Sequence, residues 1–279
     1  MNRLVLIGLL VWALASSGCS SIGLGGSSGT DPETAAAITA ASIGSHRSTA
    51  HIARNVYRHP VETLSFFGLR KDMTVIETLP GGLWYTEILA PVLRDEGQYI
   101  AASYDASLPD QPEYRLRGHQ YMLDRFQNEP EVFGPAKVVP LTAPESIDLG
   151  PPGSADMVLT FRSIHGWIRD DAAEAVFAAF FEVLKPGGVL GVVQHRAGPQ
   201  TDTSQFNGYV EQDRVIALAR AAGFRLEASS EINANPKDIA DYEGGVWTLP
   251  PTLRLGEKDR ERYVAIGESD RMTLRFRKP

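Results

Sequence analysis

Residues 75–93 read VIETLPGGLWYTEILAPVL and decide the fold. The stretch at 73–77 is short, rich in β-branched residues and ends in an acid, which is typical of a buried strand. Apolar residues at 84–93 recur at helical spacing, although Pro91 must kink that helix. A Pro-Gly-Gly turn joins the two segments. The sequence therefore predicts a strand, a tight turn and a helix in immediate succession.

The rest of the chain repeats this alternation of strand and helix. Further strands are predicted at 98–103, 137–141, 156–161, 189–194, 224–231 and 271–277, with helices at 119–128, 170–184 and 209–222. Repeated strand–helix units imply a doubly wound α/β fold with a mostly parallel sheet of seven strands. No convincing helix fills the gap before the last strand, so we expect that strand to run antiparallel.

The start of the chain has the pattern of an export signal. Arg3 is followed by an apolar run at 4–15 and by small residues that lead to Cys19, the only cysteine. The run is too short for a membrane-spanning helix, which needs about 20 apolar residues. The position of Cys19 resembles the lipobox of bacterial lipoproteins, although Ser16 stands where leucine is usual. The resemblance implies cleavage before Cys19 and its lipidation; an ordinary signal peptide with an incidental cysteine is the alternative.

These patterns predict three parts. Residues 1–18 form the signal peptide, 19–44 a lipidated cysteine with a flexible tether, and 45–279 the α/β domain. Ser20 after the cysteine implies, by resemblance, the outer membrane. We therefore expect a lipoprotein of the cell envelope that faces the periplasm and is held on the membrane by its lipid anchor.

Composition excludes several classes of protein. With 43% hydrophobic and 22% charged residues the chain is globular. Its formal charge of −7 argues against a nucleic-acid partner, since phosphate binding needs a basic face. One cysteine permits no internal disulfide, and no His/Asp/Glu spacing is typical of a metal site. Nothing in the sequence predicts the oligomeric state.

Several segments together resemble a known family. These are residues 75–93, ADMVLTFRSIHGW at 155–167, VLKPGGVLGVVQHRA at 183–197, and tail segments at 232–238, 245–256 and 267–279. They resemble class I S-adenosylmethionine-dependent methyltransferases and, more narrowly, a bacterial group of predicted methyltransferases. The resemblance covers residues 46–279. It implies a Rossmann-like fold, S-adenosylmethionine as the cofactor and a small-molecule methyl acceptor.

The resemblance also implies cofactor-binding residues around the first turn. Glu77 matches the acid at the strand end, Gly81 the central glycine, and Gly82 the small position after it. Leu79 and Leu83 stand where the superfamily usually has its first and third glycines. Adjacent glycines let a ligand approach the backbone, and the helix start offers free N–H groups.

Two more residues are predicted to contact the cofactor. Tyr85, at the start of the helix, can touch the cofactor's carboxylate or simply pack. The acid that holds the ribose in this family would fall near Ser103, and the nearest carboxylate is Asp105. A solvated loop aspartate is the alternative there.

Residues after the fourth and fifth predicted strands are candidates for the acceptor side. By resemblance, Arg162 and His165 face the substrate, and His195 and Arg196 end the next strand. A histidine near a methyl acceptor can remove a proton, because its reference pKa is about 6.5. A capping or core histidine is the alternative for both, and arginine suits an anionic group of the substrate.

Export conflicts with a cofactor that is made in the cytoplasm. The sequence therefore leaves two functions open: a methyltransferase, or a non-catalytic envelope lipoprotein whose methyltransferase-like pocket binds another ligand. A nicotinamide-dependent oxidoreductase fits less well, because the Pro-Gly-Gly turn is a poor dinucleotide fingerprint.

Overall fold

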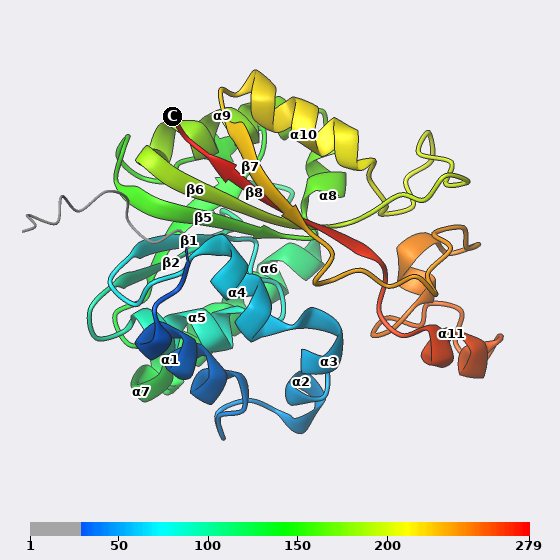
Figure 1. Cartoon of the computed structure of the whole chain (residues 1–279), viewed down its shortest axis with the longest axis horizontal. Coiled ribbons are helices and arrows are strands. Elements are labelled where there is room, and N and C mark those ends of the chain that lie inside the picture. Colours follow the sequence, from blue (N-terminus) through cyan, green and yellow to red (C-terminus); the bar gives the residue numbers. More distant parts are fainter. Residues whose placement is uncertain (1–28) are drawn as a thin grey trace, which may run out of the picture.

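The central sheet has eight strands in the order β4-β3-β2-β1-β5-β6-β8-β7 (Figure 1). A computed structural model describes residues 29–279 of the protein. The strands are β1 (Thr74–Thr78), β2 (Gln98–Ser103), β3 (Lys137–Thr142), β4 (Ser146–Ile147), β5 (Ala155–Phe161), β6 (Leu184–His195), β7 (Arg225–Ser230) and β8 (Arg271–Arg277). The predicted doubly wound α/β class is confirmed, and every predicted strand is present. The sheet has one strand more than predicted, because the two-residue β4 pairs antiparallel with β3.

Strand directions follow the expected pattern. β1 is parallel to both β2 and β5, with Ile76 opposite Ile100 on one side and Val158 on the other. β8 lies between β6 and β7 and is antiparallel to both. The prediction of an antiparallel last strand is therefore confirmed. Since antiparallel neighbours need no crossover helix, the chain between β7 and β8 is free to form a long excursion.

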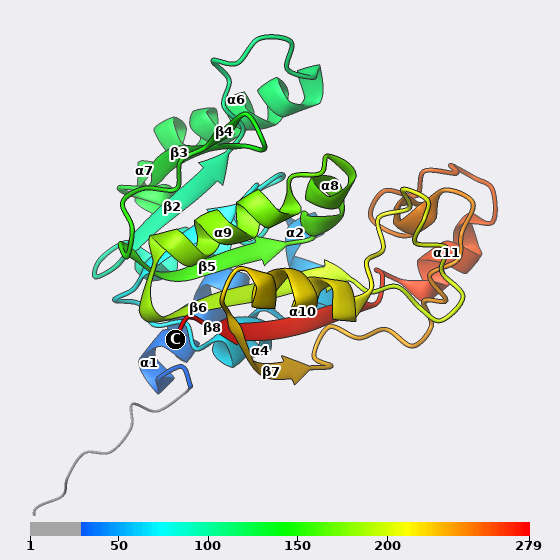
Figure 2. The same ribbon diagram turned by 90° about the horizontal axis from the view of Figure 1, so that it is seen from above.

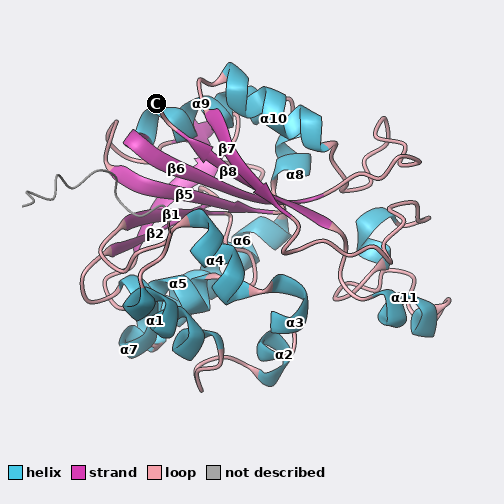
Figure 3. Ribbon diagram, viewed as in Figure 1, coloured by secondary structure: helices cyan, strands magenta, loops and turns pink. Residues whose placement is uncertain are grey.

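Helices cover both faces of the sheet (Figures 2 and 3). They are α1 (Pro32–Ser42), α2 (Thr49–Ile52), α3 (Asn55–Arg58), α4 (Pro60–Phe67), α5 (Thr86–Leu93), α6 (Glu113–Asn128), α7 (Pro130–Phe133), α8 (Ile164–Arg169), α9 (Ala173–Val183), α10 (Gln212–Ala221), the 3-10 turn η1 (Gly245–Thr248) and α11 (Arg260–Ile266). Successive side chains of a strand point to opposite faces of the sheet. Val75 belongs to the core with α1, α4 and α5, and Ile76 belongs to the core with α9. This alternation produces two apolar cores, one on each side of the sheet.

The folded part begins inside the segment that was assigned to the tether. The predicted tether reached residue 44, but its last part forms α1, whose Ile38 is fully buried against α4 and α5. Asp31 caps this helix by accepting a hydrogen bond from the Thr34 backbone N–H at 2.9 Å. An Asp-Pro start followed by alanines is a strong helix signal, so that part of the tether prediction is wrong. The predicted signal peptide and Cys19 lie outside the described residues.

The excursion between β7 and β8 forms a lobe beyond the carboxyl ends of the strands. In Figures 1 and 2 this lobe, with α11, lies beside the loop that follows β6. Tyr209 of that loop packs with Ala240 and Val246 of the lobe in a small apolar cluster of its own. The lobe therefore forms a wall over one edge of the sheet. Within residues 29–279, no helix combines the length and apolar character needed to cross a membrane.

Candidate functional site

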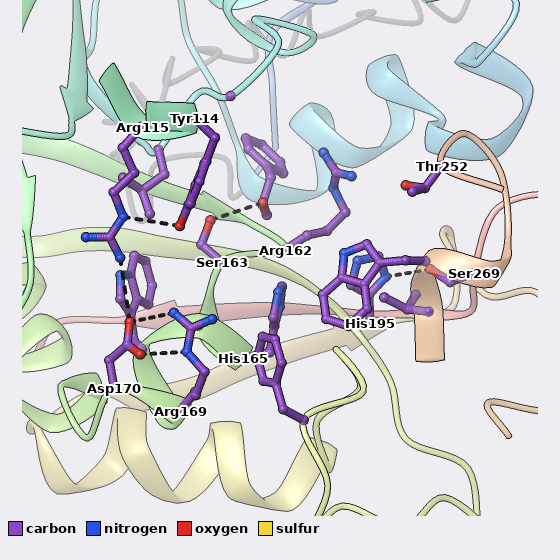
Figure 4. Close-up of a pocket in the computed structure, with 18 of the residues that line it drawn as sticks. Tyr114, Arg115, Arg162, Ser163, His165, Arg169, Asp170, His195, Thr252 and Ser269 are labelled. Carbon is purple, nitrogen blue, oxygen red and sulfur yellow. Dashed lines mark hydrogen bonds and ion pairs between the residues drawn. The ribbon is translucent and has the colours of Figure 1, made fainter. Parts of the chain in front are cut away.

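A cavity of about 650 Å³ lies where the parallel strands end and the lobe begins. The sheet contributes Leu79 and Gly81 after β1, Tyr104 after β2, Thr142 from β3, Arg162 and His165 after β5, and His195 from β6. The lobe contributes Trp247, Thr252, Glu268, Ser269 and the first residue of β8, Arg271. Ligands of open α/β sheets bind at this carboxyl edge. The position and lining make this cavity the candidate functional site (Figure 4).

The turn between β1 and α5 has an unusual backbone. Leu79 has a φ of 46°, Gly81 of 58° and Leu83 of 64°, all in the left-handed region. That region favours glycine, because a Cβ atom crowds the following carbonyl there. The two leucines therefore adopt the conformation expected of the glycines that they replace. A Cβ atom built on Gly82 would meet no atom within 4 Å, so the turn leaves its backbone open to a ligand.

Glu77 lies behind this turn rather than on the cavity wall. Its Oε2 accepts hydrogen bonds from Thr86 Oγ1 at 2.8 Å and from Tyr99 Oη at 2.7 Å. Its Oε1 accepts none from the described residues. Burial raises the pKa of Glu77 to about 7, against the opposing effect of these two donors. The carboxyl group is thus held in place with one oxygen atom still available.

The structure does not bring Tyr85 and Asp105 to the cavity wall. The Tyr85 hydroxyl donates to the Arg58 carbonyl, and its ring stacks on Phe161, which does line the cavity, with centroids 3.6 Å apart. The Asp105 carboxylate accepts hydrogen bonds from the backbone N–H and hydroxyl of Ser107 and from the Ser146 hydroxyl. These serines satisfy Asp105 locally, whereas its neighbour Tyr104 faces the cavity.

Arg162, His165 and His195, the residues assigned from the sequence to the acceptor side, all line the cavity. His165 Nδ1 lies 3.3 Å from Gln194 Nε2, and the His165 and His195 ring centroids are 6.0 Å apart. The structure pairs Arg196 with Asp270 and Glu231 instead, away from the cavity lining. Only part of the predicted acceptor set therefore converges.

Both histidines are held neutral. Burial lowers the pKa of His165 to about 4, and the charges of Arg162 and Arg169 contribute. Burial together with Arg162 and Arg271 holds the pKa of His195 well below its ordinary value. A neutral imidazole has a nitrogen that can accept a proton, and the lowered pKa values make both rings weaker bases than an ordinary histidine.

Several cavity residues escaped the sequence interpretation. The His165 ring packs with Phe206 and Trp247, at centroid distances of 5.7 and 5.8 Å. Phe206 comes from the loop after β6 and Trp247 from the short 3-10 turn η1, and neither segment carries a periodic pattern. Glu268, Ser269 and Arg271 belong to a tail segment that the family resemblance had singled out, and this was the only signal for them. Among residues 29–279, no group of His, Cys, Asp and Glu side chains is arranged to hold a metal ion.

Comparisons with known proteins identify the fold. No protein-family model matches the chain, and no curated protein matches it. Among solved structures, an S-adenosylmethionine-dependent methyltransferase from Aquifex aeolicus superposes with a TM-score of 0.53 at 14% identity, over 81% of this chain and 93% of that one. The cyclase SpnF superposes with a TM-score of 0.52 at 15% identity, over 85% of this chain and 84% of that one.

Identities this low show the fold alone. The two matching structures are named for different reactions, so the shared fold does not determine the chemistry. The chain has the mostly parallel α/β fold of S-adenosylmethionine-dependent methyltransferases, with its antiparallel last strand.

Proposed function

We propose that the protein is an S-adenosylmethionine-dependent methyltransferase that acts on a small-molecule acceptor. The observation that carries this proposal is the open turn of left-handed backbone beside a cavity that also holds two neutral histidines. The cavity's volume of about 650 Å³ is typical of small-molecule sites, which range over about 300–1,000 Å³.

The residues around the cavity fit the proposed cofactor. The rings of Tyr104 and Tyr114 can contact the flat base of the cofactor. The backbone of Gly81 can contact the methionine part of the cofactor. The free Oε1 of Glu77 can accept a hydrogen bond from an amine or a hydroxyl group. When bound, S-adenosylmethionine supplies a methyl group on a positively charged sulfur that needs no further activation.

The other end of the cavity fits the acceptor. His165 and His195 can each take a proton from an acceptor hydroxyl or amine, because both imidazoles are uncharged. Phe206 and Trp247 cover this end with aromatic surface, which excludes water from the reacting groups. The protein's contribution is to align the acceptor and keep the site dry.

A second function is favoured by a different observation. Asp105 is occupied by Ser107 and Ser146, so the predicted ribose contact is absent from the cavity wall. This supports an envelope lipoprotein whose pocket holds another ligand without catalysis. We propose the lipid anchor at Cys19 and the periplasm-facing location for either function, on the sequence pattern alone.

Calorimetry with S-adenosylhomocysteine and S-adenosylmethionine on the purified protein tests the proposal. We expect binding, weakened by about ten- to a hundredfold in Glu77→Ala, because a charged hydrogen-bond partner is lost. Asp72→Ala is the control, since that side chain is exposed and pairs with Arg70. Asp105→Ala tests the predicted ribose contact separately. If neither compound binds at millimolar concentration, the non-catalytic function is supported instead.

A further inference from the structure

The lobe end of the cavity holds more positive charge than its surroundings neutralise. Glu268, 3% exposed, accepts hydrogen bonds from Arg54 Nε at 2.5 Å, from Arg58 Nε at 3.0 Å and from Arg271. Arg162 is a fourth arginine beside this group, close enough to shift the pKa of Arg58. One carboxylate thus faces four guanidinium groups, which we call the arginine cluster.

Within residues 29–279, several donors of the arginine cluster have no hydrogen-bond acceptor. Both terminal nitrogens of Arg58 are buried without a hydrogen-bond acceptor, and the same holds for Nε of Arg271. Arg58 and Arg271 are only 1% and 2% exposed. A charged donor that is buried without an acceptor costs free energy. These nitrogen atoms therefore favour the binding of a negatively charged acceptor.

Arg162 presents this charge to the cavity. Its side chain lines the wall together with Arg271, and it donates no hydrogen bond to any residue between 29 and 279. In Figure 4 no dashed line reaches Arg162, and it lies on the side of His195, Thr252 and Ser269. Burial and the neighbouring Arg271 lower the pKa of Arg162 to about 10, which still leaves it charged at neutral pH.

Elsewhere on the cavity wall the excess is smaller. There Arg115 and Arg169 share the single carboxylate of Asp170. The whole chain carries a formal charge of −7, so the unneutralised arginines are not a general property of its surface. The charge is concentrated beside the two neutral histidines.

We propose that Arg162 and Arg271 bind an oxyanion group, a carboxylate or a phosphate, of the methyl acceptor. An arginine fork matches the paired oxygen atoms of such a group. Arg54 and Arg58 lie behind the wall and add to the positive potential. The inference rests on the proposed function for the role of acceptor, but the anion site itself does not need the cofactor.

The rings beside the site define the rest of the ligand. His165, Phe206 and Trp247 form a three-ring cluster, with Phe206 and Trp247 centroids 5.3 Å apart. A flat, apolar body joined to an oxyanion complements this surface. Benzoate is therefore a suitable probe, and benzamide is its uncharged control of the same shape.

The test measures benzoate and benzamide binding to the purified protein without cofactor, by calorimetry. We expect benzoate to bind at least about tenfold more tightly than benzamide. Arg162→Met should weaken benzoate binding by about ten- to a hundredfold and leave benzamide unchanged. Arg162→Lys should retain part of the affinity, because the charge remains. Arg115→Met, which removes the same charge at the far end, should change benzoate affinity less than about twofold, since that charge is distant and is paired with Asp170.

The cofactor's own carboxylate is the competing occupant. S-Adenosylhomocysteine carries that carboxylate, and 5′-methylthioadenosine does not. If Arg162→Met weakens the binding of S-adenosylhomocysteine but not that of benzoate, the arginines bind the cofactor and the inference is overturned. Equal binding of benzoate and benzamide also overturns it, even where S-adenosylhomocysteine binds. Benzoate binding without any S-adenosylhomocysteine binding supports the anion site and overturns the methyltransferase function. Thermal unfolding of each variant, unchanged from the wild type, shows that a lost affinity is not a lost fold.

Discussion

Nδ1 of His195 and Oγ of Ser269 lie 2.6 Å apart, although 74 positions separate the two residues in the chain. His195 ends β6, and Ser269 comes just before β8, so the antiparallel pairing of these strands brings them together. The serine hydroxyl can donate to Nδ1 or accept from it, and this hydrogen bond holds the neutral imidazole in one orientation. Ser269 is therefore a positioning residue for a candidate base.

Ser269→Ala should let the His195 ring change its orientation. It should not change cofactor binding at the other end of the cavity. Loss of one buried hydrogen bond costs about 1–2 kcal/mol of unfolding free energy. The nitrogen chemical shifts of His195, read by NMR, should change from one tautomer to a mixture. Ser269→Thr, which keeps the hydroxyl, should restore a single tautomer. An unchanged tautomer in Ser269→Ala would contradict the role, and S-adenosylhomocysteine affinity serves as the control for the cofactor end.

The sequence predicted the parts of the fold whose cause is local. The strand at β1, its turn and its helix were predicted because β-branched residues, a glycine pair and helical spacing lie in one continuous stretch. The helix α1 was not predicted, although its Asp31-Pro32 start is also a local signal, because the segment assigned to the tether extended over its residues. The two-residue β4 exists only through its pairing with β3, which no sequence pattern records.

The site was predictable only where it follows the strand ends. Arg162, His165 and His195 were found because parallel strands bring their carboxyl ends to one edge. Contacts such as Arg58 with Glu268, which are 210 positions apart, depend on how the lobe folds back. Asp105 shows the reverse case, since a carboxylate in the expected place is satisfied by its own loop.

Glu77 should make stability depend on pH in an unusual direction. Its pKa in the folded protein is about 7, above the ordinary value of 4.5, so the fold prefers the protonated form. This preference costs nothing below pH 4.5; the penalty grows as the pH rises from 4.5 to 7 and then levels off at about 3 kcal/mol. Glu77→Gln removes the titrating group. The free energy of unfolding, measured in urea, should rise in the variant relative to the wild type between pH 5 and pH 8. The same difference between the two proteins at both pH values would contradict the prediction.

Because the backbone at Leu79 is left-handed, we predict that a glycine variant is more stable there than an alanine variant, which reverses the usual order. Leu79→Ala and Leu79→Gly remove nearly the same packing, but only glycine accepts a φ of 46° without strain. We expect the glycine variant to be more stable by about 0.5–1 kcal/mol in denaturant unfolding. The same pair at Leu226, in β7, is the control and should show the usual order, with alanine more stable. If alanine is also preferred at residue 79, the turn does not have this conformation.

Cys19 allows the proposed anchor to be tested apart from the enzyme. Cys19→Ala removes the thiol that lipidation requires, and two or more acyl chains are needed for stable anchoring. We expect the wild type in the membrane fraction of expressing bacteria, and the variant in soluble or unprocessed form. Cys19→Ser is a closer steric control and should behave like the alanine variant. If both variants are processed like the wild type and still remain attached to the membrane, the lipoprotein proposal is excluded.

His165 should stay neutral far below the usual titration range of histidine. Burial is the main cause of its pKa of about 4, and the positive charges of Arg162 and Arg169 add to it. A proton NMR titration that follows the His165 ring should therefore show no midpoint between pH 8 and pH 5. Arg162→Gln removes one of the two repelling charges and should move the midpoint upward, toward the reference value of about 6.5. Arg115→Gln, at the far end of the cavity, should leave it in place. A wild-type midpoint near 6.5 would mean that the ring is open to water, and His165 would then lose its assignment as a base that remains available in acid.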